Sequence, residues 1–410
     1  MSRLWDKGLP LDQRVLKYTA GEDHQLDARL VAYDIRASIA HAEMLLEVGL
    51  LTQEDCQKIT NGLKQLQLDY TNGKWKINLE DEDVHTALEV NLTKLIGGVG
   101  GRIHLGRSRN DQVLVALRLY MLDAIDEIAS STNMLCVALD ALKQRQGEIP
   151  LPGMTHMQHA MPSSVALWCD AFIEAFEDAK IGLENAKIRS NKNPLGTAAG
   201  YGTPSLPIDR AITTEKLGFA VTQLPVTAAQ LSRGKAEAHL LFESTMVMQD
   251  LGRLSSDLLL YYTQEFSYIN LAPEVTTGSS IMPQKRNPDV LELIRASTAT
   301  AHACLSECLM VVAKIPSGFQ RDLQKIKAPL FRAIDITIES IEVMTHLISS
   351  LEFKPENIKL DKSLFAAEEA YKLVLEEGVS FREAYRRIGE NLSLIHISES
   401  TRLLSISYAV

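Results

Sequence analysis

The feature that most constrains this chain is a proline-free stretch of helical periodicity that begins at Arg109 and ends at Ile149. From Leu114 to Leu142 its apolar side chains recur in steps of three and four, which is the spacing of one face of an α-helix. At 1.5 Å per residue such a helix is roughly 50 Å long. Because that length exceeds what one small globular core needs, the stretch predicts a bundle whose helices also contact other subunits.

Further helical stretches predict an all-α fold around this helix. The same rhythm recurs without proline at 233–266, and two more helical segments are expected at 163–193 and 289–315. A fifth, 327–350, is interrupted only by Pro329 near its start. Alternating apolar patterns, which would indicate strands, are nearly absent. The composition, 410 residues of which 46% are hydrophobic, is sufficient for a large core or several domains.

Shorter helical stretches before and after the bundle predict two smaller domains. Near the N-terminus one stretch ends at Gly49, Thr52 has the context of a helix N-cap, and another stretch ends at Gly97. After the bundle, a Lys-Pro-Glu turn at 354–356 begins a third helical region. We therefore predict a small helical domain at 1–105, a central bundle at 106–352 and a short C-terminal helical domain at 353–391.

Charge, cysteine content and hydropathy exclude several classes of protein. A net charge of −10 and a pI near 5.6 argue against nucleic acid or an acidic membrane surface as the main partner. Five widely spaced cysteines favour free thiols in a reducing compartment, and Cys304 and Cys308 have no clustered partner ligands for a metal. The chain has neither a signal-like N-terminus nor 18 consecutive apolar residues. We therefore predict a soluble, cytoplasmic protein, and no motif calls for a metal or an organic cofactor.

The stretch from Thr276 to Asp289, TTGSSIMPQKRNPD, carries the strongest chemical signal. Gly278 and the two serines after it form a flexible, hydroxyl-rich turn, and Pro283 stiffens the second half of the stretch. Three side-chain donors at 285–287 precede a helix whose N-terminus adds exposed N–H groups and positive potential. The combination predicts a loop that brings a hydroxyl to an anionic substrate. A simple glycine–serine linker would not need this ordered set of donors.

Four further motifs are rich in groups that bind anions or transfer protons. GRSRNDQ at 106–112 places paired arginines at the start of the longest helix, and a helix cap would explain only its serine, amide and acid. GMTHMQHAMP at 153–162 holds two histidines in a proline-bounded loop, although a lone histidine is more often structural than catalytic. DEDVHTALE at 81–89 reads most simply as a helix-capping region, and PSGFQRDLQKIK at 316–327 supplies further polar groups.

Together these motifs resemble the fumarase/aspartase superfamily, whose members expel a group from a succinyl skeleton to release fumarate. MPQKRNPD and SRNDQ look most like those of the argininosuccinate lyases, and the similarity runs from about Leu4 to Asn391. The resemblance implies a three-domain lyase that forms a homotetramer with sites shared between subunits. It also implies β-elimination of argininosuccinate to L-arginine and fumarate, the last step of arginine biosynthesis. Two alternatives stay open: another fumarate-releasing lyase, such as adenylosuccinate lyase, and a non-catalytic crystallin-like protein on the same scaffold.

The resemblance further implies roles for individual residues. Ser279 would be the base, His156 the acid, Lys285 a stabiliser of developing negative charge and Glu292 the residue that orients His156; the reverse assignment of acid and base stays open. The implied substrate-binding residues are Thr19, His85, Arg107, Ser108, Arg109, Asn110, Thr155, Gln158, Asn287, Phe319, Gln324 and Lys327. Phe319 stands where the family usually has a tyrosine, and Thr19 where it has a serine.

The last stretch, 392–410, departs from the family pattern. After Asn391 the resemblance stops, and LSLIHISESTRLLSISYAV is an apolar, β-prone string with interleaved serines. The family continues there with further helices, so the domain at 353–391 is a truncated version of the family's C-terminal domain. We interpret 392–410 as a foreign or frame-shifted tail that packs poorly and leaves apolar surface uncovered.

Overall fold

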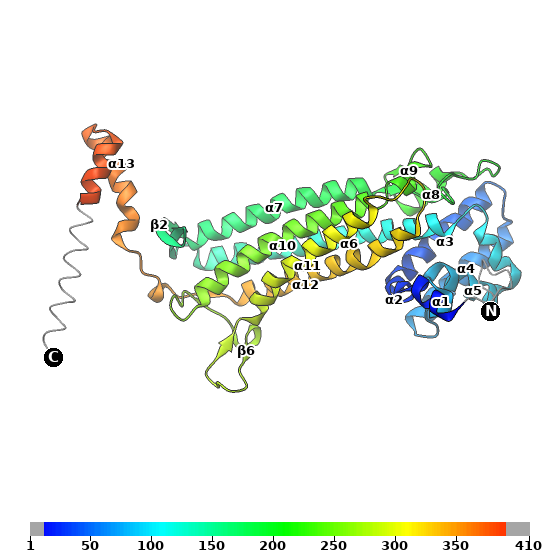
Figure 1. Ribbon diagram of the computed structural model, residues 1–410, viewed down its shortest axis with the longest axis horizontal. Coiled ribbons are helices and arrows are strands. Elements are labelled where there is room, and N and C mark those ends of the chain that lie inside the picture. The colour runs from blue at the N-terminus through cyan, green and yellow to red at the C-terminus, as the bar shows by residue number, and fades with distance from the viewer. Residues whose placement is uncertain (1–11, 391–410) are drawn as a thin grey trace. The chain divides into compact units, whose positions relative to one another are not determined.

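A computed structural model describes residues 12–390, which form an α-helical fold with a few short strands (Figure 1). This confirms the predicted all-α class. The predicted tail at 392–410 lies outside the described residues. Within the described residues no helix is both long enough and apolar enough to cross a membrane.

The chain forms two compact units. Of the described residues, unit 1 comprises 12–132, 178–249 and 296–341, and unit 2 comprises 133–177, 250–295 and 342–390. Both units contain segments that are distant in sequence. The division therefore describes the chain differently from the three consecutive domains expected above, and those boundaries stay a prediction.

Five long helices dominate the structure and confirm the periodicity. They are α6 (Arg109–Gln146), α7 (Val165–Ser190), α10 (Lys235–Tyr262), α11 (Asp289–Val312) and α12 (Lys327–Ser350). Figure 1 shows them side by side, and side-chain contacts join neighbours: Lys187 of α7 pairs with Asp126 of α6 at 2.5 Å, and Trp168 of α7 donates to Asp257 of α10 at 3.0 Å. The predicted starts and ends agree with the observed ones to within a few residues because glycines, prolines and caps bound these helices.

The apolar face predicted for α6 is the face that is buried. Leu114, Leu117 and Met121 are fully buried, and the same rhythm continues through Leu139 to Leu142. Full burial of a leucine side chain is worth about 1.5–3 kcal/mol. A helix of 38 residues with one continuous buried face is therefore held by packing along its length rather than by helix propensity alone.

Shorter elements complete unit 1 and position its polar residues. They are α1 (Gln13–Ala20), α2 (Asp23–Leu26), η1 (Asp27–Leu30), α3 (Val31–Glu47), α4 (Gln53–Thr71), η2 (Leu79–Asp81), α5 (Val84–Ile96), η3 (Gly97–His104), β3 (Lys192–Asn193), α8 (Arg210–Leu217), β4 (Val221–Thr222), α9 (Ala228–Leu231) and η5 (Arg321–Ile326). Thr52 is the N-cap of α4, as predicted, because its hydroxyl accepts from the backbone N–H of Asp55 at 3.1 Å. The strands β3 and β4 form a short parallel pair.

In unit 2 two segments predicted as loops are hairpins. The antiparallel strands β1 (Pro150–Thr155) and β2 (Gln158–Ser164) are joined by a turn at His156 and Met157, whose φ angles are 53° and 59°. Positive φ at both central residues is the geometry of a type I′ turn, which matches the twist of a hairpin. The strands β6 (Thr277–Gly278) and β7 (Arg286–Asn287) bracket the serine-rich segment in the same antiparallel way.

The prediction that 153–162 is an irregular loop was therefore wrong. Pro150, Pro152 and Pro162, which bound this stretch, disfavour strands because proline cannot donate to a ladder. In a two-stranded ribbon, however, both strands are edges, and Pro152 lies directly opposite Pro162. A backbone nitrogen on the outer side of such a ribbon has no strand partner, so a proline there costs no ladder bond.

The remaining elements of unit 2 are short. They are β5 (Ile269–Asn270), which pairs with β8 (Glu352–Phe353), and η4 (Pro273–Val275), η6 (Pro355–Asn357), η7 (Lys362–Phe365) and α13 (Ala366–Glu377). None of the five cysteines forms a disulfide, and all five side chains are buried.

Candidate active site

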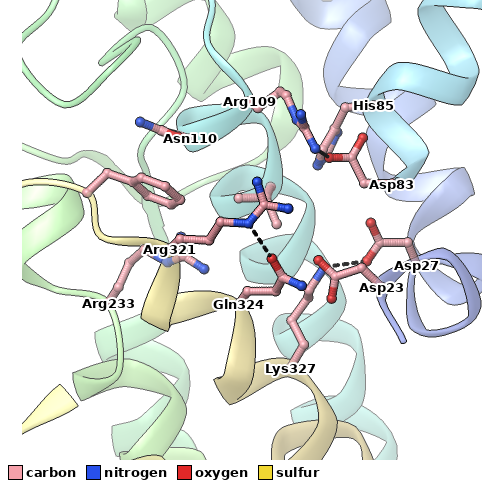
Figure 2. A pocket seen from close by; sticks show the side chains of 12 residues that line it. Asp23, Asp27, Asp83, His85, Arg109, Asn110, Arg233, Arg321, Gln324 and Lys327 are labelled. Atoms are coloured by element: carbon pink, nitrogen blue, oxygen red, sulfur yellow. Dashed lines mark hydrogen bonds and ion pairs between the residues drawn. The ribbon is translucent and has the colours of Figure 1, made fainter. Parts of the chain in front are cut away.

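A cavity of about 170 Å³ in unit 1 gathers polar residues from segments that are distant in sequence. Figure 2 shows them converging from the region of α2 and η1, the start of α5, the start of α6, and the η5–α12 segment. The lining consists of Asp23, Asp27, Asp83, His85, Arg109, Asn110, Val113, Arg233, Phe319, Arg321, Gln324 and Lys327. The structure thus brings together six of the predicted residues: His85, Arg109, Asn110, Phe319, Gln324 and Lys327.

Lys327, the first residue of α12, is held by two carboxylates inside the cavity. Its Nζ lies 2.7 Å from Asp27 Oδ1 and 2.8 Å from Asp23 Oδ2, and its side chain is 2% exposed (Figure 2). Burial alone would lower the pKa of Lys327, but Asp27 and Asp23 outweigh it and the pKa is raised. Burial raises the pKa of Asp23 to about 6, against the influence of Lys327. Since an ammonium has three donors, one N–H of Lys327 remains for a ligand.

His85 is oriented by a buried carboxylate behind it. Its Nδ1 lies 2.9 Å from Asp34 Oδ2 in α3, and both side chains are almost fully buried. Burial would lower the pKa of His85, but Asp34, Asp83 and Asp27 together raise it. Its Nε2 is buried and has no partner among the described residues. The arrangement fixes the imidazole ring and leaves one nitrogen for a group that enters the cavity.

Arg109 is paired with the residues that precede α5. Its Nη2 forms a close ion pair with Asp83 and lies 3.5 Å from Glu82 Oε2 (Figure 2). Burial would raise the pKa of Asp83, but His85 and Arg109 outweigh it and the pKa is lowered. Asp83 and Glu82 therefore balance the charge of Arg109 in the cavity wall, and they fix the orientation of its guanidinium.

The other residues of the SRND block support the start of α6. Ser108 caps the helix: its hydroxyl accepts from Asn110 N at 3.3 Å, and its own N–H donates to Asp111 Oδ1 at 2.9 Å. Burial raises the pKa of Asp111 to about 6, although it also accepts from two backbone N–H groups of the 196–198 segment. Arg107 is buried beside the Asp34–His85 pair, where it donates to Ser38 Oγ at 2.8 Å.

The η5 segment is tied to the end of α1 through the backbone of Thr19. Arg321 and Gln324 donate to the Thr19 carbonyl at 2.8 and 3.0 Å, whereas the Thr19 hydroxyl donates to Val15 O within its own helix. Thr19 therefore positions the cavity wall through its main chain. The Phe319 ring centroid lies 5.7 Å from the guanidinium carbon of Arg233, which is cation–π distance.

Five charged lining residues were missed from the sequence: Asp23, Asp27, Asp83, Arg233 and Arg321. Asp83 lies inside the DEDVHTALE motif, two residues before the histidine that was chosen. Asp23 and Asp27 are four residues apart, a spacing that places two side chains on one helical face. Each signal was present, but nothing local connected it with Lys327.

The four predicted catalytic residues all belong to unit 2. His156 is exposed at the tip of the β1–β2 hairpin, next to Thr155 and Gln158, which are also exposed. Ser279 is half-buried after β6, Lys285 is exposed before β7, and Glu292 is exposed in the first turn of α11. In the described part of the chain no hydrogen bond or ion pair joins Glu292 to His156.

The Ser279 hydroxyl accepts two hydrogen bonds from the backbone of its own loop. Its Oγ accepts from the backbone N–H groups of Ile281 and Met282, at 3.3 and 3.1 Å. Asn287 donates across the hairpin to Gly278 O at 3.4 Å, which holds the two ends of the loop together. Two N–H donors aimed at one oxygen are the elements of an oxyanion hole. Among residues 12–390 no cluster of three or more His, Cys, Asp or Glu side chains forms a metal-binding group.

Comparison with known proteins places this fold in a family. Residues 11–302 match the family described as Lyase. The chain is 41% identical to an argininosuccinate lyase of Sorangium cellulosum over 98% of this chain and 93% of the relative, and 40% identical to one of Thermotoga neapolitana over 95% and 98%.

Solved structures share the fold at lower identity. An EDDS lyase in complex with formate matches with a TM-score of 0.79 and 24% identity, over 96% of this chain and 78% of that chain. A class II fumarase from Schistosoma mansoni matches with a TM-score of 0.76 and 18% identity, over 93% of both chains. The extent of the sequence match shows that this chain belongs to the argininosuccinate lyase family of the fumarase/aspartase superfamily.

Proposed function

We propose that this protein cleaves argininosuccinate by β-elimination to L-arginine and fumarate, as the last step of arginine biosynthesis in the cytoplasm. About 40% identity to argininosuccinate lyases over nearly the whole chain supports the proposal. The observation that carries it is the cavity of unit 1. There Arg109 and Lys327 offer donors for carboxylates, while Asp23 and Asp27 offer acceptors for cations. Argininosuccinate carries three carboxylates, an ammonium and a guanidinium, so it needs both kinds of partner.

In the proposed mechanism Ser279 removes the proton next to a carboxylate and His156 supplies a proton to the departing nitrogen. A serine is a poor base, so its oxyanion needs stabilisation, and the N–H groups of Ile281 and Met282 provide it. Lys285 and Asn287 bind the carboxylate on which negative charge develops. Glu292 holds His156 in one orientation when the site is assembled.

We propose further that the site is completed between subunits of a homotetramer. The cavity is lined by unit 1 alone, whereas His156, Ser279, Lys285 and Glu292 all belong to unit 2 and are exposed or half-buried. Proton-transfer groups that protrude from one chain suit a cavity of another chain. Thr155, Gln158 and Asn287 would then bind substrate from the same protruding segments.

The proposed activity is tested by turnover with two substrates offered separately. Purified protein is given argininosuccinate or adenylosuccinate, and the release of fumarate is followed by its ultraviolet absorbance. Fumarate from argininosuccinate alone is the expected result. Release from adenylosuccinate but not from argininosuccinate would overturn the assignment, and no release from either would favour a non-catalytic protein.

The shared site is tested by mixing two inactive variants. His156→Asn and Ser279→Ala are denatured together, refolded and compared with each variant refolded alone. If different chains supply the two groups, some sites of the hybrid tetramers carry both intact residues and activity returns. Mixtures that form tetramers, as measured by light scattering, but stay inactive would contradict the shared site.

A further inference from the structure

A second cavity in unit 1 has a different charge composition from the first. Its volume is about 430 Å³, and it shares no lining residue with the cavity described above. It lies where α6, the end of α7, the β3–β4 pair, α9 and the start of α10 meet. Four cationic side chains line it, namely Arg118, Arg189, Lys192 and Lys235, and its described lining contains no carboxylate.

Arg118 places a fixed positive charge in the wall of this cavity. The residue is 1% exposed; its Nη1 donates to the carbonyls of Arg189 and Ser190 at 3.1 and 3.2 Å, and its Nη2 donates to Ser232 Oγ at 3.0 Å. Its Nε is buried without a partner among the described residues. Burial lowers the pKa of Arg118, and the carboxylate that acts against this is Glu237.

Glu237 does not neutralise Arg118 by contact. Its Oε2 accepts from the backbone N–H of Gly234 at 2.8 Å, so it caps the start of α10. A buried guanidinium bound only to carbonyls and a hydroxyl is unfavourable unless an anion compensates its charge. The cavity that Arg118 lines offers room for such an anion.

Three further cations and exposed apolar side chains line the same cavity. Lys192 and Lys235 form no ion pair among the described residues, and the Arg189 Nε donates only to the neutral acceptor His239 Nδ1, at 3.0 Å. Leu224 and Leu231 are exposed at 73% and 63%. A ligand with clustered anionic oxygens and a small carbon body would contact both kinds of surface.

We propose that this cavity binds a small anion with two or more negative charges, a polycarboxylate or a phosphate compound. We propose also that the bound anion changes the affinity of the first cavity for substrate. The short helix α9 connects the two cavities. Ala228 and Leu231 line the second cavity, whereas Gln230 donates to Asn110 O at 3.2 Å, and Asn110 lines the first. In addition, Ser232, which holds Arg118, directly precedes Arg233 of the first cavity. A ligand that moves this segment therefore changes the binding of substrate.

Binding is tested on the full-length protein by isothermal titration calorimetry with citrate and, separately, with inorganic phosphate, at constant ionic strength. The test variant is Lys192→Glu/Lys235→Glu, which changes only exposed or half-buried residues. The matched control is Lys64→Glu/Lys76→Glu, which makes the same change of charge on exposed lysines outside both cavities. A buried-site variant, Arg118→Met, is compared by the same titration, with circular dichroism as the check of folding.

We expect wild type and control to bind at least one of the two anions, and the test variant to bind it at least about tenfold more weakly. Citrate alone would identify a polycarboxylate site, phosphate alone a phosphate site. No binding of either anion to wild type, or equal weakening in test and control variants, would overturn the proposal.

The coupling between the cavities rests on the proposed lyase activity and is measured separately. We expect the bound anion to change the KM for argininosuccinate at least about twofold in wild type and in the control, and not in Lys192→Glu/Lys235→Glu. Binding without a change in KM would refute the coupling through α9. A protein that binds the anion but never releases fumarate would refute the proposed function and leave the anion site standing.

Discussion

Replacement of Lys327 by methionine is expected to destabilise unit 1, and more strongly at high pH than at low pH. In the folded protein the Lys327 ammonium lies within 2.8 Å of both Asp23 and Asp27, and it is almost fully buried. Lys327→Met leaves the two carboxylates buried without the cation between them. Removal of one partner from a buried ion pair costs about 3–5 kcal/mol in the free energy of unfolding.

The pH dependence of this loss arises from Asp23. Burial already raises the pKa of Asp23 from 3.8 to about 6 while Lys327 opposes the rise, so the variant raises that pKa further. An acid whose pKa is higher in the folded state contributes stability that is present below its unfolded pKa and is lost as the pH rises through its folded pKa. For each unit by which Lys327→Met raises the pKa of Asp23, about 1.4 kcal/mol of the lost free energy of unfolding depends on pH. At about pH 5 Asp23 takes up a proton and part of the loss is recovered.

The assay is the urea midpoint of wild type and variant at about pH 5 and about pH 8. The difference between the two proteins is compared at each pH, so that the titration of other groups cancels. Lys327→Arg, which keeps the charge, should retain most of the stability. Lys327→Met/Asp23→Asn/Asp27→Asn should no longer show a larger loss at high pH than at low pH, because the two carboxylates that Lys327→Met leaves without a cation are gone. A loss for Lys327→Met that is equal at both pH values, or larger at low pH, would refute the reasoning.

Three further substitutions test individual side chains. Ser279→Ala should lower kcat by more than about tenfold while the Kd for argininosuccinate changes little, because the hydroxyl acts in proton transfer. A kcat within about tenfold of the wild-type value would exclude Ser279 as the base. Phe319→Tyr should tighten substrate binding by at most about 1.5–3 kcal/mol if the partner of the usual phenol is present, whereas unchanged Kd would indicate a wall rebuilt around phenylalanine. Asp34→Asn should lower the pKa of His85, because Asp34 raises it in the wild type. If protonated His85 binds substrate, KM rises as His85 loses its proton, and this rise should occur at a lower pH in the variant. An unshifted pH profile of KM would exclude this positioning role of Asp34.

The long helices could be predicted from the sequence because their signals are local. The apolar steps of three and four along α6 directly specify the side chains that are buried, from Leu114 to Leu142. Thr52 and the glycines that follow helices mark helix ends through contacts within one turn of the chain. The β1–β2 hairpin could not be predicted in the same way, because whether Pro152 is tolerated depends on the strand opposite it, at Pro162.

The cavity could be predicted only in part, since its chemistry depends on pairs that are distant in sequence. Arg109 and Lys327 were recognised through their motifs, but the carboxylate that holds Lys327 lies 300 residues away at Asp27. An anionic substrate predicts cations in its site, and nothing in the local sequence indicates that acids lie beside them. The same limit applies to Asp34, whose role is visible only once α3 and α5 bring it to His85.

The charges of the two cavities argue for two kinds of ligand. In the first, Lys327 and Arg109 are already paired with carboxylates, so a simple anion would compete with those internal partners and leave buried acids uncompensated. A substrate with both anionic and cationic groups avoids that cost. Its carboxylates bind Lys327 and Arg109, and its cations take the place of these residues beside the buried acids. In the second, Arg118 has no carboxylate in contact, so an anion there meets no internal competitor. The first cavity therefore selects a substrate of mixed charge, while the second favours a purely anionic ligand.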